Sequence, residues 1–319
     1  MIRLLAARLA TAAATMVGAA FVTFALLSAA PGDRARMVAN ARFGGEGAAD
    51  PAVVAAITRE LGLDQPMIFQ FLGWLSRAIQ LDVGTSFVNG RPVGEIVAHA
   101  LAETIPLALA AFGFGVVVAF ALACLAVMRP RSAIDAGVVA LSSLGAAMPS
   151  FWTGLILILV FSVWLGWLPA YGHDSPLHGV LPALTLSLWL IASKTRVFRG
   201  FLREALAAPY LDALRVRGVG ETTLLLRHVT KHVLVGALPL LCLDLALMLE
   251  GAVIVETVFA RPGVGLTLLG ALQARDYPVV LCLIAVAALA YVGATALADG
   301  LATRLDPRLL QAAAMPGGG

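Results

Sequence analysis

Charged residues are scarce in this sequence: Asp, Glu, Lys and Arg make up 13% of its 319 residues, whereas 60% are hydrophobic and the mean hydropathy is +0.92. A soluble domain of this length needs more charge to cover its surface, so the composition indicates a protein embedded in a lipid bilayer. The net charge of +3 does not indicate a nucleic-acid partner, because the basic residues lie beside apolar runs, where they orient membrane helices.

Cysteine is rare as well, and the three present, Cys124, Cys242 and Cys282, all lie inside apolar runs. They have neither metal-ligand spacing nor the loop setting of disulfides, and we interpret them as small packing residues. His228 and His232 are spaced i, i+4, but their basic neighbours favour a solvated helix face over a metal site.

Catalytic and nucleotide-binding motifs are missing. The sequence contains no Gly-Lys pair and therefore no phosphate-binding G-x-x-x-x-G-K-[ST] loop. It also contains no H-E-x-x-H zinc motif and no G-x-S-x-G serine elbow. We therefore expect no enzyme activity, no metal site and no bound cofactor in this chain.

Long apolar runs are present instead, and a transmembrane helix needs about 20 apolar residues. The run 136–172 is too long for one straight crossing and contains Pro149, so we expect a kinked helix that ends near Trp164 and Trp167. The shorter run 262–274 suits a re-entrant or interfacial helix. Six spans are predicted, over 9–32, 104–128, 136–172, 181–193 with its flanks, 233–255 and 277–298.

The lysines and arginines predict that both termini are cytoplasmic. With the N-terminus inside, 14 of the 22 fall in cytoplasmic segments, and six more lie in the long external segment, where the charge rule does not act. Only Arg261 and Arg275 oppose this orientation. Arg3 and Arg8 precede the first span, whose apolar run exceeds the 7–15 residues of a signal peptide, so we interpret it as an uncleaved anchor.

Two polar stretches separate the spans. The internal stretch, 199–232, is predicted to form short helices around Pro209, a cap at Gly218 and a further helix over 221–231. The external stretch, 33–103, contains two helix starts, Asp50-Pro51 and Asp64-Gln65-Pro66. The second of these helices has apolar residues at helical spacing, which we expect to form one buried face: Ile68, Phe71, Leu72, Leu75 and Ile79.

Several short motifs follow one another along nearly the whole chain. They are L-G-L-D-Q-P at 61–66, D-V-G-T-S at 82–86, P-S-F-W-T-G at 149–154, L-P-A-L-T-L at 181–186, P-G-V-G at 262–265, R-D-Y-P at 275–278 and D-P-R at 306–308. Each motif alone is weak evidence, but their order is specific. The sequence resembles the first, B-type permease subunit of the oligopeptide/dipeptide ABC importers, a family that also includes nickel permeases.

The stretch after Pro209 is similar to this family's version of the E-A-A-x-x-x-G coupling motif, a short helix that docks into a groove on the ATPase. The sequence departs from the motif by having Asp in place of Glu, Leu214 in place of the second Ala and Pro209 where the family usually has Asp, and it lacks the I-x-L-P tail. The residues that match, and for which the resemblance implies ATPase coupling, are Tyr210, Asp212, Ala213, Arg215, Arg217 and Gly218.

The resemblance implies an all-α membrane protein with six transmembrane helices and the type I ABC importer permease fold. The expected organisation is a first span over 1–32, an external helical segment over 33–103, a permease core over 104–306 that holds the coupling loop 199–232, and a cytoplasmic tail over 307–319. The implied partners are a second homologous permease, two ATP-binding subunits that hold ATP and Mg²⁺, an external substrate-binding protein and the lipid of the bacterial inner membrane.

The expected function is ATP-driven import of peptides or similar small solutes by alternating access. A nickel or metallophore permease is one alternative, and a proton-coupled secondary transporter is another. Asp244 and Glu250 lie inside the predicted fifth span, where an acid costs about 2.5–3.5 kcal/mol. We expect them to face the translocation pathway, which would favour cationic or amino-bearing substrates, or to pair with a basic or polar group of the partner permease, or to lie protonated near a membrane interface. Because they lie about 120° apart around the helix, they cannot share one proton.

Overall fold

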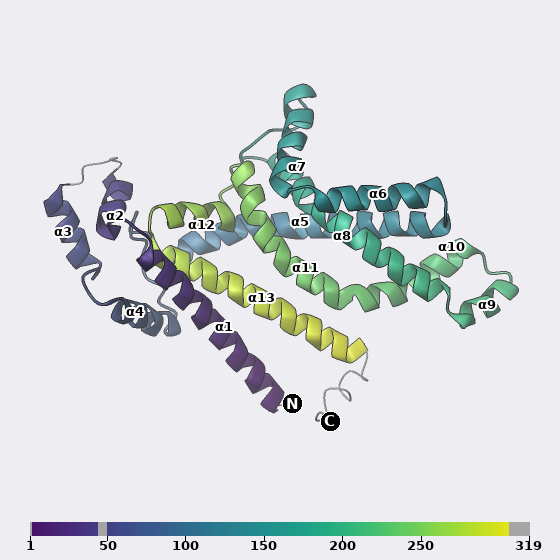
Figure 1. Ribbon diagram of the computed structural model, residues 1–319, viewed down its shortest axis with the longest axis horizontal. Coiled ribbons are helices and arrows are strands. Elements are labelled where there is room, and N and C mark those ends of the chain that lie inside the picture. Colours follow the sequence, from purple (N-terminus) through teal and green to yellow (C-terminus); the bar gives the residue numbers. More distant parts are fainter. Residues whose placement is uncertain (1, 44–49, 306–319) are drawn as a thin grey trace. The chain divides into compact units, whose positions relative to one another are not determined.

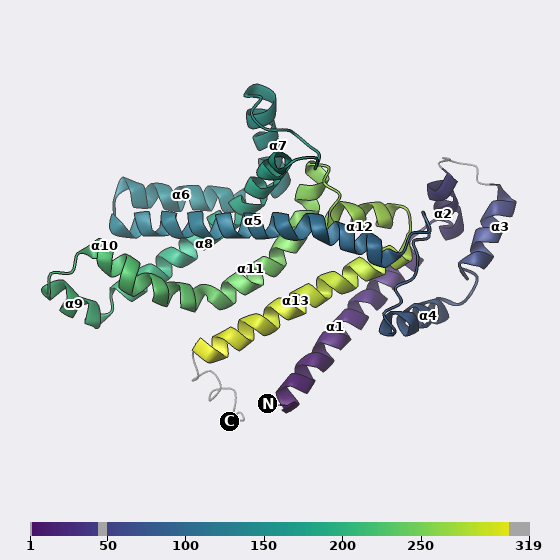
Figure 2. The same ribbon diagram turned by 180° about the vertical axis from the view of Figure 1, so that it is seen from behind.

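The computed structural model describes residues 2–43 and 50–305, and its regular elements in these ranges are helices (Figures 1 and 2). The expected cytoplasmic tail, 307–319, lies outside the described residues. The helices are α1 (Ile2–Ala29), α2 (Arg34–Phe43), α3 (Pro51–Glu60), α4 (Met67–Ile79), α5 (Val93–Met128), α6 (Ala133–Ala147), α7 (Ser150–Leu157), η1 (Ile158–Trp164), η2 (Pro176–Gly179), α8 (Val180–Leu206), α9 (Pro209–Val216), α10 (Glu221–Thr223), η3 (Leu224–Val229), α11 (Thr230–Val258), α12 (Val264–Gln273) and α13 (Tyr277–Leu305).

By length and composition, five helical segments of the described chain could cross a membrane, and a bent pair of helices makes a sixth if the pair is counted as one span. This count confirms the six predicted spans. The third span, however, is broken and not merely kinked: α6 and the helical run from Ser150 to Trp164 meet at 106°. Pro149 cannot continue a helix and forces Met148 before it into an extended conformation, with ψ at 129°.

Several helices extend beyond the limits of their predicted spans. α5 begins at Val93, before the expected start at residue 104, and α8 continues to Leu206. The residues 221–231 are helical as predicted, but this helix is continuous with the fifth span, because α10 and the π-helical turn η3 run directly into α11. Gly94 and Gly200 lie within two of these extensions without ending the helix, and the helices continue past the apolar residues from which their ends were predicted.

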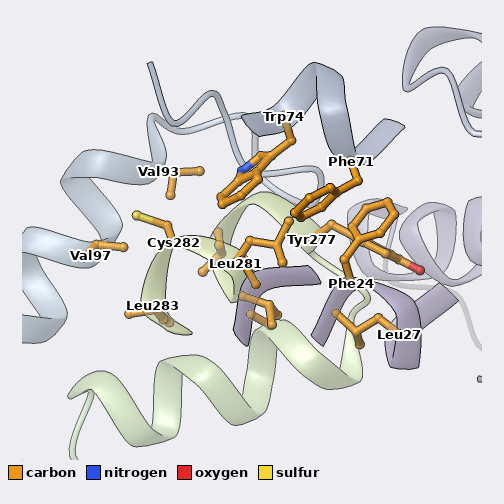
Figure 3. Packing of buried hydrophobic residues seen from close by; sticks show 14 residues of the cluster. Phe24, Leu27, Phe71, Trp74, Val93, Val97, Tyr277, Leu281, Cys282 and Leu283 are labelled. Atoms are coloured by element: carbon orange, nitrogen blue, oxygen red, sulfur yellow. The ribbon is translucent and has the colours of Figure 1, made fainter. Parts of the chain in front are cut away.

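The described chain forms two compact units. The first takes its residues from 1–104 and 261–292, and the second from 105–260 and 293–319. In the first unit, α1, α4 and the start of α13 share one apolar cluster, and Figure 3 shows Phe71 and Trp74 pointing from α4 toward Phe24 and Leu281.

The predicted buried face of α4 is rotated relative to the observed one. The sequence is apolar on two sides of this helix, and the bulky Trp74, which was not included in the prediction, occupies the core. The residues in or against the core are Phe71, Trp74, Leu75 and Ala78, whereas Ile68, Leu72 and Ile79 are exposed.

In the second unit, α8 packs against α6, α7 and α11. Small residues allow these helices to approach closely, as is common in membranes. A Cβ added to Gly145 of α6 would lie 3.1 Å from Ala192, and one added to Gly251 of α11 would lie 3.1 Å from Leu186. α8 is therefore the helix against which this unit is assembled.

Candidate functional site

The predicted coupling segment is the short helix α9. Ala208 precedes it in an extended conformation, and Pro209 occupies its first turn, where a missing N–H costs nothing. Leu211 points inward and is fully buried in a cluster with Phe198, Leu202 and Leu225. This apolar anchor attaches α9 to α8 and η3.

Gly218 ends α9 in the manner expected of a cap. Its φ is +82°, in the left-handed region, and its N–H donates to the Arg215 carbonyl at 2.9 Å. The N–H of Val219 donates to the Leu214 carbonyl at 3.2 Å, which completes a Schellman motif. A Cβ on Gly218 would meet no atom within 4 Å, so the backbone angle and not crowding favours glycine here.

Most of the predicted coupling residues lie on the outer side of α9. Tyr210 is 53% exposed, and Asp212, Ala213 and Arg217 are exposed as well. Arg215 differs, because its guanidinium is held within the chain by Asp212 at 2.8 Å and Glu221 at 2.7 Å. These contacts raise the pKa of Arg215. Arg215 therefore links α9 to α10 through its ion pair with Glu221.

A cavity of about 540 Å³ lies beside α9. Tyr210, Phe201 and His232 line it, and these residues come from α9, α8 and α11. The outer side of α9 and this cavity together offer a surface on which a protein partner could dock.

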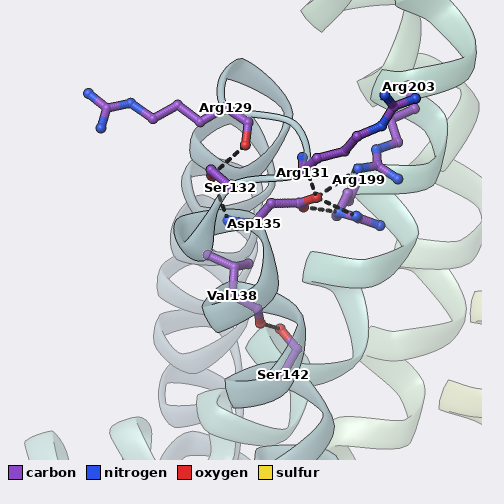
Figure 4. A network of polar contacts seen from close by, with 8 residues as sticks. All are labelled: Arg129, Arg131, Ser132, Asp135, Val138, Ser142, Arg199 and Arg203. Atoms are coloured by element: carbon purple, nitrogen blue, oxygen red, sulfur yellow. Dashed lines mark hydrogen bonds and ion pairs between the residues drawn. The ribbon is translucent and has the colours of Figure 1, made fainter.

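Asp135 forms a charge cluster that sequence reasoning missed (Figure 4). Ser132 caps α6 by accepting from the Asp135 N–H at 3.3 Å, and the Asp135 carboxylate faces α8. Arg199 Nε lies 2.6 Å from Oδ1, and Arg203 donates to Oδ2 at 2.8 Å. Two features of the sequence could have indicated this cluster. Arg199 and Arg203 are spaced i, i+4 after an apolar run, and Asp135 is an acid at the start of the preceding predicted span.

Asp244 has a partner in its own chain. Its carboxylate Oδ1 lies 2.8 Å from Lys194 Nζ, and the Asp244 and Lys194 side chains are only 5% and 12% exposed. Both residues lie about 21 Å along their helices, α11 and α8, from the ends at Val258 and Val180. This pairing neutralises Asp244, a solution that the sequence interpretation had not considered.

Glu250 is placed differently. It is exposed, and it lines a cavity of about 430 Å³ between α7, α8 and α11. The other lining residues are mainly apolar and include Met148, Trp189 and Ile254. Asp244 and Glu250 of α11 therefore lie in separate environments, one paired with a lysine and one open.

The R-D-Y-P motif organises the first unit. Arg275 is buried and donates to the carbonyls of Leu27 at 2.6 Å and Pro31 at 2.8 Å, so it satisfies acceptors at the end of α1. Asp276 accepts hydrogen bonds from the Ser86 hydroxyl and, at 2.9 Å, from the Phe87 N–H. The sequence had marked these residues only as a family motif, and the structure shows that they join distant segments of one unit.

Known proteins match nearly the whole chain. The family described as the binding-protein-dependent transport system inner membrane component matches residues 111–311, and the family of the N-terminal part of such components matches residues 1–108. A Brucella abortus protein, provisionally named a peptide transport system permease, is 36% identical over 97% of this chain and 99% of its own length.

A second relative is the glutathione transport system permease protein GsiC of Escherichia coli K12. It is 32% identical over 90% of this chain and 92% of its own length. Among solved structures, the inward-facing MetNI methionine ABC transporter resembles the chain with a TM-score of 0.56 and 16% identity, over 67% of this chain and 98% of that one. This likeness shows the fold alone.

The matches agree with the helical fold and with the motif order along the sequence. The chain belongs to the family of binding-protein-dependent transport system inner membrane components, and it is the multi-pass inner-membrane permease subunit, not the catalytic one, of an ABC importer.

Proposed function

We propose that this permease carries peptides or peptide-like solutes of the size of glutathione. The observation that supports this most is the similarity to the Brucella abortus protein over 97% of the chain, which includes the N-terminal segment. Peptide transport and glutathione transport are named for the two relatives, and neither name refers to nickel or a metallophore. Peptides and glutathione have in common that each is a short peptide with a charged end.

The importer that we propose is a heterodimer of this chain with a second homologous permease. The family implies ATPase and binding-protein partners, and we infer two ATP-binding subunits, which hold ATP and Mg²⁺, and an external binding protein. The outer side of α9, with Tyr210 and Arg217, is the surface that we assign to ATPase docking.

We infer that both termini and α9 are cytoplasmic. The charge bias of the sequence supports this orientation. The two arginines that oppose it have partners within the first unit, because Arg261 lies 2.7 Å from Glu103 and Arg275 donates to carbonyls at the end of α1. Their charges therefore do not require a cytoplasmic location.

The movement of the ATPases on closing would be transmitted to the translocation pathway through α9. Leu211 anchors α9 to the cluster that contains Phe198 of α8 and Val233 of α11, and α8 and α11 also line the Glu250 cavity. A movement of α9 would therefore move the helices beside the cavity, as alternating access requires.

Reconstitution tests this function. The chain is assembled with its co-encoded permease and ATPases in proteoliposomes, and uptake of labelled glutathione and of a labelled dipeptide is measured with the binding protein outside. We expect uptake that requires ATP and the binding protein. Uptake that a proton ionophore abolishes, and that continues without ATP, would instead support a proton-coupled transporter.

A further inference from the structure

The acids of the second unit differ in how their charges are balanced. Asp135 has two arginine partners, and Asp244 has Lys194. Glu250 has no ion-pair partner among the described residues. The described lysines and arginines of this unit lie at 129–131, at 194–231 and at 304, and none of them lines the Glu250 cavity.

The Glu250 carboxylate, which has no ion-pair partner among the described residues, lies well inside a predicted span. Glu250 lies about 12 Å along α11 from its end at Val258, inside the helix predicted as the fifth span. An ionised acid within a span is costly, and such residues typically face a water-filled path or a partner charge. The fold supplies such partners to Asp135 and Asp244 but leaves the cavity open beside Glu250.

The cavity suits a small organic cation. Its volume, about 430 Å³, lies within the range of small-molecule sites. Among the described residues that line it, Glu250 is the only charged one; Trp189, a residue that is 40% exposed, contributes an aromatic ring, and Met148 and Leu247 contribute apolar surface. A carboxylate with an aromatic ring beside it binds ammonium groups through a charge-assisted hydrogen bond and a cation–π contact.

We propose that Glu250 and Trp189 form a subsite for the primary ammonium group of the transported solute. This inference rests on the proposed function, since the solute must pass this cavity. The apolar wall would accept different side chains next to the amine, and the carboxylate would reject a solute whose amine is acylated. Asp244 has no such role, because Lys194 already neutralises it.

Ligand binding to the purified permease–ATPase complex, without binding protein, tests the subsite. The probes are alanyl-alanine amide, which carries one ammonium group, and its neutral N-acetylated form, and binding is followed by saturation-transfer difference NMR. We expect the wild-type complex to prefer the amine at least tenfold. Glu250→Gln should abolish this preference, and Glu250→Asp should keep part of it. Asp174→Asn, which removes an exposed acid elsewhere in the second unit, should leave it unchanged.

Three results would overturn the subsite: equal binding of the two probes to the wild type, no binding of either probe, or an unchanged preference in Glu250→Gln. Loss of the second permease from purified Glu250→Gln would also overturn it and would make Glu250 an interface charge. Binding-protein-stimulated ATP hydrolysis is measured on the same samples. If the wild type shows this stimulated hydrolysis but gives one of the results above, only the subsite is rejected. If the wild type shows no stimulated hydrolysis, the proposed function is rejected.

Discussion

Gly218 adopts a backbone conformation that other residues reach only at a cost. Left-handed φ values disfavour residues with a Cβ by about 1–2 kcal/mol, and β-branched residues most of all. We expect Gly218→Val to distort the end of α9 and to lower binding-protein-stimulated ATP hydrolysis at least tenfold, with normal membrane insertion. The measurement is ATP hydrolysis by the reconstituted complex.

Gly220 provides the matched control for this substitution. Its φ is −68°, and a Cβ there would meet no atom within 4 Å, so Gly220→Ala should retain full coupling. Transport by Gly218→Val at the wild-type rate would mean that the match to the coupling motif is misleading.

Asp276 makes the first unit sensitive to pH. Burial raises the pKa of this carboxyl above its ordinary value of 3.8, although hydrogen bonds from Ser86 and Phe87 oppose the shift. Because the folded pKa is higher than the unfolded one, the stabilising contribution is complete below about pH 3.8 and is lost as pH rises through the folded pKa. Acidification from neutral pH should therefore protect this unit.

Limited proteolysis of the external segment measures this effect. Asp276→Asn keeps an acceptor for the Phe87 N–H and has no carboxyl to titrate. We expect the ratio of wild-type to Asp276→Asn cleavage rates to rise from about pH 4 to pH 8. Asp64→Asn, which changes an exposed acid in the same unit, is the control. A ratio that does not vary with pH would refute the assignment.

At the scale of helices, the Lys194–Asp244 pair joins α8 to α11. Removing one partner of a buried pair leaves a charge unbalanced, which costs on the order of 3–5 kcal/mol, whereas replacing both by apolar residues is often neutral. We expect Lys194→Met or Asp244→Leu alone to lower the thermal midpoint of the complex and the yield of assembled ATPase. The double variant should recover most of both. Additive losses in the double variant would show that the two side chains do not interact.

The sequence predicted the number of spans well and the ends of the helices poorly. Apolar runs reveal the part of a helix that lies in lipid, but they do not reveal that the polar C-terminal end of α8 is helical, where Arg199 and Arg203 bind Asp135 of another helix. For the same reason, the Asp244 environment was not predictable: its partner, Lys194, lies 50 residues earlier in the chain, and only the packing of α8 on α11 brings them together. Local signals were reliable, as at Gly218 and at Asp50, which caps α3 through the Ala52 N–H at 2.9 Å.

For the whole molecule, the orientation is directly measurable. In a background without the three native cysteines, we expect Arg217→Cys to react with an impermeant maleimide only from the cytoplasmic side. Ala56→Cys, on an exposed site of α3, should react only from outside. Both positions are accessible in the fold, so weak labelling would not arise from burial. External labelling of Arg217→Cys would reverse the proposed topology.

The order of synthesis gives the Ser86–Asp276 contact a further meaning. The two residues are 190 positions apart, so at 5–20 residues per second Ser86 leaves the ribosome about 10–40 s before Asp276 exists. During that interval Phe71 and Trp74 also lack the α13 residues of their cluster. The nascent segment 33–103 must therefore wait, its aromatic side chains only partly covered, until nearly the whole polypeptide has been translated. Quality-control proteases would have their best opportunity in that interval, and a chain that stops before residue 261 would never leave it.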